Sequence, residues 1–199
     1  MPRKNRFQVV SGFSTHHVVQ RGINRSSVFQ SHHDYAYFKD QIRRYLSKYD
    51  TVKIYHYCFM PNHIHLLCFT AKAPQLSRFM QSLLLAYSSY YRKKYRYSGY
   101  LWQGRFKAFP IQKDSYLLEC ARYIERNPLR TKRRMVERLS SYRWSSYNFY
   151  ANGTQDDIIT EDPLHKNLGA TAEERRTCYQ EYILIPRPYE QLIDDVFRI

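Results

Sequence analysis

The class of protein is first limited by what the sequence lacks. It has few cysteines, no long apolar run and a shortage of acidic residues. The four cysteines form no Cys-x-x-Cys pair and no disulfide framework, which is typical of a protein from a reducing cytoplasm. No apolar run approaches the roughly 18 residues of a membrane span, and the opening MPRKNRFQVV lacks the apolar core of a signal peptide. We therefore expect a cytoplasmic protein with no membrane partner.

The shortage of acidic residues is concentrated in one part of the chain. Lys and Arg number 32 against 17 Asp and Glu, which gives a net charge of +15. Residues 1–150 hold 27 basic and 7 acidic residues, a surplus of +20, whereas residues 151–199 hold 5 and 10, a balance of −5. A cationic body attracts polyanions, so nucleic acid is the expected partner and the nucleoid the expected place. We predict a catalytic domain over 1–153 and an acidic C-terminal extension over 154–199.

Hydrophobic periodicity and turn residues predict seven elements in the order β-α-β-β-α-β-α. Pro61-Asn62 marks a hairpin turn, and Pro110 indicates an edge strand. Gly99 and Pro128 are expected to end the second and third helices. The predicted strands cover 15–23, 51–60, 63–69 and 106–111, and the predicted helices 31–50, 74–98 and 115–127. This is the order of the ferredoxin-like fold, so we expect an α+β domain with an antiparallel four-stranded sheet and packed helices.

Two histidines separated by one residue stand in the predicted hairpin, in FMPNHIHLLCF (59–69). Successive strand residues alternate between the faces of a sheet, so His63 and His65 share a face and Cys68 lies on the other. The register of Cys58, across the turn, is left open. Three interpretations follow: an ordinary exposed strand pair, a structural zinc site with cysteine ligands, or a metal site whose third ligand comes from elsewhere.

The last predicted core helix offers that third ligand. Tyr123 and Asn127 are four residues apart and share a helix face. The core-facing residues Leu117, Ala121 and Ile124 lie to one side of them. A helix packed on the sheet by that core face would place a phenol and an amide beside the two histidines. Two imidazoles and the amide oxygen would then surround a metal ion, with the phenol next to it.

Two alternatives bear on the choice of tyrosine and histidine. Tyr123 alone would be a packing residue in a chain with 20 tyrosines. Tyr116, seven residues earlier, points within about 20° of the same helix face and is a rival nucleophile. The remaining histidine doublets do not place two rings on one face, so no metal is assigned to His16, His17, His32 or His33.

Five sequence blocks in order resemble one protein family. MPNHIHLL resembles the His-hydrophobic-His (HUH) motif, and RYIERNP resembles the helix motif of single-tyrosine HUH transposases, which act on single-stranded DNA. The second motif lies within the longer block YLLECARYIERNPLR. Together with MPNHIHLL and the blocks HHVVQRGINR, LWQGRFKAF and YRWSSYNFY, it spreads over residues 15–150 and looks like the REP-associated tyrosine transposases. Asn127 stands where related insertion-sequence transposases more often carry glutamine, and an amide oxygen is present either way.

The resemblance implies a mechanism and its residues. It makes Tyr123 the nucleophile, because the motif places the tyrosine four residues before the amide. The product would be a 5′-phosphotyrosine that a new strand end can later attack. A divalent metal, Mg or Mn, would be held by His63, His65 and Asn127, although imidazole ligands by themselves favour transition metals. The implied substrate is REP-type hairpin DNA, and the enzyme would be a monomer or a homodimer.

Basic and polar residues near these blocks are the candidate DNA contacts. Those that match family blocks are Arg21, Asn24, Arg25, Arg105 and Lys107, and those in LRTKRR after the tyrosine helix are Arg130, Lys132, Arg133 and Arg134. The alternative function is a basic ferredoxin-like nucleic-acid-binding module without chemistry. A phosphoesterase with paired His-x-Thr motifs is excluded, because the sequence has one His-x-His and no second copy.

The acidic extension allows two hypotheses. Residues 154–199 would either lie over the cationic groove as a lid that competes with DNA, or contribute a small helix, AEERRTCYQEYI (172–183), packed on the body.

Overall fold

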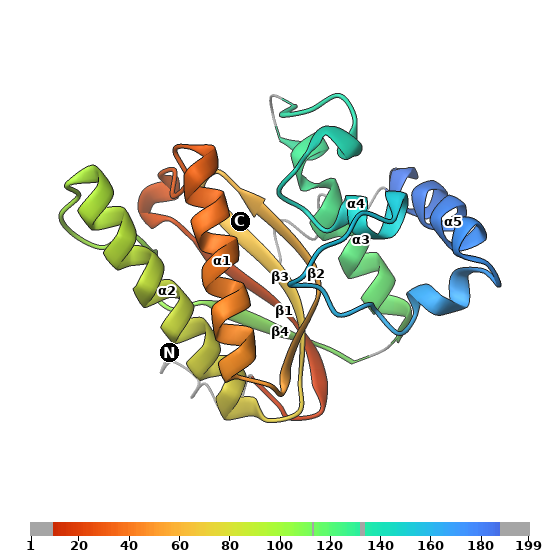
Figure 1. The fold of residues 1–199 in the computed structure, drawn as a ribbon, viewed down its shortest axis with the longest axis horizontal. Helices are drawn as coiled ribbons and strands as arrows, with labels where there is room; N and C mark the ends of the chain where they lie inside the picture. The colour runs from red at the N-terminus through yellow and green to blue at the C-terminus, as the bar shows by residue number, and fades with distance from the viewer. Residues whose placement is uncertain (1–9, 113, 132–133, 188–199) are drawn as a thin grey trace.

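The computed structural model describes residues 10–112, 114–131 and 134–187 (Figure 1). Its four strands form one antiparallel sheet in the spatial order β2-β3-β1-β4. The strands are β1 (Ser14–Arg21), β2 (Val52–Met60), β3 (His63–Thr70) and β4 (Lys107–Ile111). The helices are α1 (His32–Lys48), α2 (Ala73–Tyr95), α3 (Asp114–Arg130), α4 (Tyr147–Asn152) and α5 (Ala172–Leu184). The predicted α+β fold is confirmed. Within the described ranges, no helix has the length and apolarity needed to cross a bilayer.

Helices cover both faces of the sheet. Phe59 of β2 and Ile64 of β3 are cross-strand partners on one face, and the ring of Phe38 from α1 lies 5.3 Å from that of Phe59. His65 points to the opposite face, where the ring of Tyr123 from α3 lies 5.7 Å from it. Figure 1 shows α1 and α2 together on one side of the sheet and α3 on the other. The His-x-His pair is therefore enclosed between the sheet and α3.

The predicted turn and edge strand are confirmed. Pro61 and Asn62 separate β2 from β3, which pair as a hairpin. β4 pairs with β1 and lies at the edge of the sheet, so Pro110 can lack an N–H without breaking a ladder on its open side.

Two predicted helix ends are wrong. α2 ends at Tyr95 instead of Gly99, because Arg96 adopts a left-handed conformation with φ 49° and caps the helix before the glycine is reached. α3 continues through Pro128 to Arg130. A proline inside a helix leaves the carbonyl four residues earlier without its backbone donor. The structure replaces that donor with a side chain, and the replacement also shapes the candidate site.

The chain after α3 builds a second apolar cluster. Its buried members come from both sides of residue 153 and are Leu139, Tyr147, Tyr150, Ala151, Tyr179 and Ile183. α5 includes residues 172–183 and packs against α3 and α4, which is the arrangement of the packed-helix hypothesis. Figure 1 shows α5 with α3 and α4, on the far side of the sheet from α1 and α2. The described part of the extension therefore supports the helix that carries Tyr123.

Candidate active site

The two histidines of β3 lie together in the interior. His63 is 8% exposed and His65 is fully buried, so the interpretation as an ordinary exposed strand pair is wrong. Their ring centroids lie 4.8 Å apart with the planes nearly perpendicular. The Nε2 atom of each ring is buried and has no hydrogen-bond partner. A buried polar atom without a partner is costly and needs an explanation, which a bound ligand would provide.

The protonation of His63 follows from its neighbours. The Asn62 side-chain amide donates from Nδ2 to the carbonyl of Arg25 at 3.2 Å, which turns its oxygen toward His63. His63 Nδ1 lies 2.6 Å from that oxygen and must donate to it. The lone pair is then on Nε2. Burial and the positive charge of Arg21 lower the pKa of His63 to about 4, so the ring is neutral near pH 7 and able to bind a metal.

The Nδ1 atom of His65 is also within hydrogen-bond distance of a side chain, in this case another histidine. His65 Nδ1 lies 2.9 Å from Nε2 of His17, on the neighbouring strand β1. Burial lowers the pKa of His65 well below its usual value, and nearby positive charges, among them Arg130, act in the same direction. His65 is thus also a neutral ring with Nε2 facing the site.

Asn127 presents its amide oxygen because its nitrogen is used by the helix. Asn127 Nδ2 donates to the carbonyls of Tyr123 at 2.9 Å and Ile124 at 3.1 Å. The Ile124 carbonyl is the one that Pro128 cannot serve, since proline has no N–H. The side chain of Asn127 therefore keeps α3 helical beyond the point where Pro128 was expected to end it. With both amide protons directed at the helix, the oxygen is left as a lone-pair donor near His63. It could accept from Nε2 only if that ring were protonated, so it raises the pKa of His63 against the larger, opposite effect of burial.

Tyr123 packs directly against the histidines. Its side chain is 1% exposed, and its ring lies edge-on to His65 at 5.7 Å and to His17 at 5.9 Å between centroids. The guanidinium of Arg130, two turns later on α3, lies 5.0 Å from the ring centroid. Tyr116, by contrast, is 58% exposed. The structure therefore brings Tyr123, and not Tyr116, to His65 and His17.

Several of the candidate DNA contacts form a rim beside His63. Arg21 is the cross-strand partner of His63 and donates from Nε to the side chain of Gln103 at 3.0 Å. Backbone hydrogen bonds join the two loops of the rim, from Ile23 N to Leu101 O at 2.9 Å and from Gln103 N to Arg21 O at 2.8 Å. The exposed Asn24, Arg25 and Arg105 belong to these loops.

Other candidate DNA contacts lie further along the chain. Lys107 begins β4 and is exposed, and Arg134 is exposed beyond α3. Arg130 ends α3, over the Tyr123 ring. Lys132 and Arg133 fall outside the described residues.

Cysteines do not complete a metal site in the described part of the chain. Cys68 pairs with Ile54 and His16 on the face away from His63 and His65, as parity predicts. Cys58 is the cross-strand partner of His65, but its thiol donates to the Met60 sulfur at 3.6 Å. Among the described residues, no group of three or more His, Cys, Asp or Glu could hold a metal ion.

The residues around His63 and His65 fit a divalent ion. The buried Nε2 atoms of His63 and His65 have no hydrogen-bond partner, and the amide nitrogen of Asn127 is used by the helix, which leaves its oxygen as a third donor. A divalent cation satisfies such a set, and N and O ligands suit Mn as well as other first-row metals. The expectation of Mg or Mn held by these residues is therefore chemically consistent with their protonation.

Sequence reasoning missed three residues that orient this set. Asn62 directs His63, His17 contacts His65, and Pro128 leaves the carbonyl that engages Asn127. Asn62 was visible as a turn residue adjacent to the motif, and Pro128 as the neighbour of Asn127. The contact of His17 depends on the register between β1 and β3, for which the sequence carries no local signal.

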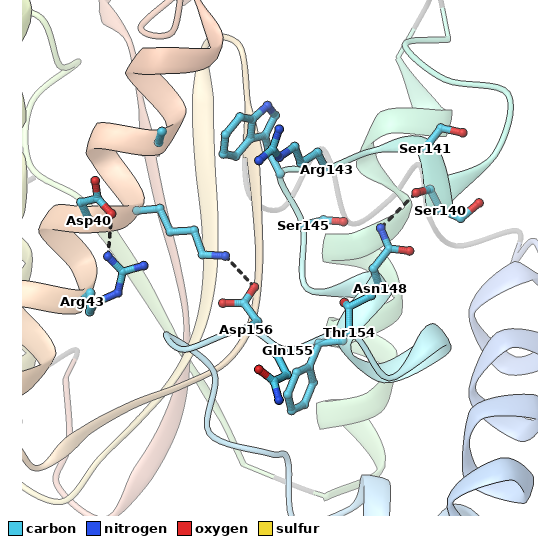
Figure 2. A pocket seen from close by; sticks show the side chains of 14 residues that line it. Asp40, Arg43, Ser140, Ser141, Arg143, Ser145, Asn148, Thr154, Gln155 and Asp156 are labelled. Carbon is cyan, nitrogen blue, oxygen red and sulfur yellow. Dashed lines mark hydrogen bonds and ion pairs between the residues drawn. The ribbon is translucent and has the colours of Figure 1, made fainter.

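A separate polar cleft of about 550 Å³ opens between α1 and residues 140–156 (Figure 2). Two of its basic side chains form ion pairs, Lys39 with Asp156 at 2.9 Å and Arg43 with Asp40 at 2.6 Å. None of the proposed catalytic or metal-binding residues lines it. This cleft is distinct from the histidine–tyrosine site.

The fold and the site define a class of protein, a ferredoxin-like α+β domain in which two same-face histidines meet a tyrosine-bearing helix. Comparison with protein families makes the class specific, because the family model of IS200-like transposases matches residues 11–127. The chain belongs to the IS200-like transposase family, which connects it with DNA transposition.

Two solved structures are similar to this chain, and the first of them shares its fold. A REP-associated tyrosine transposase bound to a REP hairpin is 17% identical and covers 81% of this chain and 93% of its own, with a TM-score of 0.59. A candidate transposase from Deinococcus radiodurans R1 is 18% identical and covers 63% of this chain and 96% of its own, with a TM-score of 0.41. A comparison with curated proteins gives no match.

Proposed function

We propose that this transposase nicks and rejoins single-stranded DNA through Tyr123, at a divalent-metal site formed by His63, His65 and Asn127. The observation that carries the proposal is that the buried Nε2 atoms of His63 and His65 lack hydrogen-bond partners beside the buried Tyr123 ring, on the helix that also carries Asn127. Each of the three has its other polar atom occupied, so each directs a lone pair into the same space. A bound Mg or Mn ion would withdraw charge from a non-bridging phosphate oxygen.

The reaction is a transesterification. The phenolic oxygen of Tyr123 forms a bond to phosphorus, and the bond from phosphorus to the 3′ oxygen breaks. The phenolic proton passes to solvent and the departing 3′ oxygen takes up a proton, so a 5′-phosphotyrosine and a free 3′-hydroxyl result. Arg130, whose guanidinium lies over the ring, favours the negative charge that develops on the phenol. The reverse attack by another 3′-hydroxyl joins a new strand.

The proposed substrate is REP-type hairpin DNA with a single-stranded foot. Two observations support it: the solved transposase of the same fold is bound to a REP hairpin, and this chain has a basic rim beside His63. The exposed Arg25 and Arg105 of that rim are suited to phosphate contacts. The binding of a short single strand also suits aromatic stacking, which tolerates any base.

We also propose that α3 acts within its own subunit, so that a monomer suffices. Glu125, between Tyr123 and Asn127 on α3, lies 3.0 Å from His56 on β2 of the same chain. It also accepts from Tyr179 of α5 at 2.8 Å. All of these groups are fully buried, so within one subunit α3 already has its polar partners on β2 and α5 and needs none from a second copy.

The test uses a hairpin oligonucleotide with Mn²⁺, followed by a denaturing gel. A covalent protein–DNA band is expected from the wild type, from Tyr116→Phe, and not from Tyr123→Phe. Loss in Tyr116→Phe with retention in Tyr123→Phe would reassign the nucleophile. DNA binding without any covalent band under all metals tried would leave the alternative function, a non-catalytic nucleic-acid-binding module.

The cis arrangement is tested by mixing two inactive variants, Tyr123→Phe and His65→Ala. If each subunit uses its own tyrosine and histidines, the mixture stays inactive. Recovery of the covalent band in the mixture would show that α3 is shared between subunits.

A further inference from the structure

His17 is a fully buried histidine that the proposed reaction does not use. Its ring stacks on that of His65, with centroids 5.1 Å apart and 20° between the planes. Its Nε2 atom lies 2.9 Å from His65 Nδ1. The same ring meets the edge of Tyr123 at 5.9 Å. It is thus in contact both with a proposed metal ligand and with the proposed nucleophile.

We propose that His17 is a positioning residue whose Nε2 accepts a hydrogen bond from the N–H at His65 Nδ1. This hydrogen bond keeps the lone pair of His65 on Nε2, directed at the metal site. The inference rests on the proposed function, because it assigns a purpose to the orientation of His65. His17 itself is not a ligand, since its Nε2 is already occupied by this hydrogen bond.

The argument depends on counting protons. A hydrogen bond between two neutral imidazole nitrogens contains one proton, so either His65 Nδ1 or His17 Nε2 donates. If His17 donated, His65 would carry its proton on Nε2 and would point an N–H into the site. That N–H would face the other lone-pair donors of the site and would exclude a cation. Only donation by His65 leaves a lone pair on the site-facing atom of each of these groups.

The two other groups show the same design. His63 donates from Nδ1 to Asn62, and Asn127 donates both amide protons to carbonyls of α3. In each case the atom away from the site takes the proton, and the atom facing the site keeps its lone pair. Outer partners of this kind orient metal-bound histidines and raise their basicity. His17 completes the set for His65.

The sheet holds His17 in place. On β1 it is the cross-strand partner of Leu67 on β3 and of Phe109 on β4. The Phe109 ring lies 6.2 Å from its own. His16, the adjacent residue, points to the other face of the sheet, where its Nε2 accepts from the Ser11 N–H at 3.2 Å. The doublet therefore provides a matched control at the neighbouring position.

The first experiment measures Mn²⁺ affinity by calorimetry, without DNA. His17→Leu removes the acceptor and is expected to weaken binding about 10- to 100-fold. His17→Gln offers an amide oxygen at the place of Nε2 and is expected to stay within about threefold of the wild type. His16→Gln, on the other face, is expected to leave the affinity unchanged. Equal affinity in His17→Leu and the wild type, with both folded by circular dichroism, would overturn the inference.

The second experiment needs neither metal nor a variant. Nitrogen-15 NMR of the metal-free wild type reports which ring nitrogen of each histidine is protonated. We expect His65 protonated on Nδ1, and a hydrogen bond to His17 Nε2. Protonation of His65 on Nε2 would contradict the inference even if His17→Leu did not fold.

The proposed function and this inference fail in different ways. If His63→Ala and His65→Ala bind Mn²⁺ as the wild type does, the metal site itself is wrong. If those two variants lose Mn²⁺ while His17→Leu keeps it, the metal site stands and only the role of His17 falls.

Discussion

The two sides of helix α3 treat buried polar groups in opposite ways. On the side facing β3, the buried Nε2 atoms of His63 and His65 have no hydrogen-bond partner, and Asn127 directs its amide protons at helix carbonyls. On the side facing β2 and α5, Glu125 accepts from Tyr179 at 2.8 Å, and Arg126 donates to the carbonyls of residues 183 and 184 at 3.0 and 2.8 Å. One side leaves two imidazole nitrogens without a partner, whereas on the other side every side-chain polar atom of His56 and Glu125 is hydrogen-bonded within the chain.

Two buried histidines make the contrast quantitative. Burial and, to a smaller extent, the positive charge of Arg21 lower the pKa of His63 to about 4. Burial also acts to lower the pKa of His56, but hydrogen bonds and charges from Asp162 and Glu125 outweigh it and raise the pKa to about 9. Near pH 7 the first ring is therefore neutral and the second is charged. Carboxylates make the difference, because Asp162 and Glu125 flank His56, whereas the amides of Asn62 and Asn127 flank His63.

The two sides of α3 therefore have different roles: one holds the helix on the sheet, and the other carries the residues of the proposed reaction. A buried charge network that is fully hydrogen-bonded resists rearrangement, because removing one member leaves the others unpaired. It holds α3 at one position on the sheet. The opposite side of the same helix can then keep Tyr123 and Asn127 within reach of the histidines at little further cost in entropy.

The largest expected effect comes from the site side. Tyr123→Phe removes only a hydroxyl, so we expect strand cleavage to fall by at least about 10³-fold, while Tm changes by less than about 3 °C. Single-turnover cleavage and a melting curve on the same sample check both parts. A variant that cleaves normally, or one that unfolds, would break the contrast between the two sides.

The next effect comes from the anchoring side. His56→Ala leaves Glu125 and Asp162 buried without their shared cation, and we expect a loss of about 3–5 kcal/mol in the free energy of unfolding. For a chain of this length that is a fall in Tm of roughly 10 °C. Urea titration measures it. A change below about 1 kcal/mol would show that the network does not anchor α3.

The pH dependence of stability is a further test of the anchoring role of His56. Because folding raises the pKa of His56 from 6.5 to about 9, its contribution to stability is fully present below pH 6.5 and is lost as the pH rises through 9. We expect the free energy of unfolding to fall by up to about 3 kcal/mol over that window. His56→Gln, which keeps one donor to a carboxylate, is the control and should lose this slope. Parallel curves for the two proteins would contradict the prediction.

The smallest effects are expected at the basic rim. Arg25→Ala and Arg105→Ala each remove one exposed charge, so each should lower hairpin affinity modestly and reduce the slope of log Kd against log salt by about one. Fluorescence anisotropy across a salt series measures this. Lys53→Ala, an exposed cation on β2 at the opposite edge of the sheet from β4, is the control and should leave the slope unchanged.

Local patterns predicted the fold and the pairing of the site to a useful degree. Alternation in β3 placed His63 and His65 on one face, and helical spacing placed Tyr123 with Asn127, because both periods are properties of the backbone. The end of α3 was mispredicted at Pro128, because a side chain supplied the missing donor. Helix propensity rules do not consider a side chain that replaces a missing backbone donor.

What could not be predicted depends on contacts distant in sequence. His56 meets Glu125 across 69 residues and Asp162 across 106, and His17 meets His65 across 48. Such pairs follow from the register of strands and the path of the C-terminal segment. Neither the strand register nor the path of that segment can be predicted from the residues adjacent to these side chains.

The most direct test of the central claim is anomalous diffraction at the manganese edge from crystals grown with Mn²⁺. We predict one strong peak bonded to Nε2 of His63, Nε2 of His65 and Oδ1 of Asn127, beside the Tyr123 hydroxyl. A peak on any other group, or none between β3 and α3 at saturating Mn²⁺, would contradict the account.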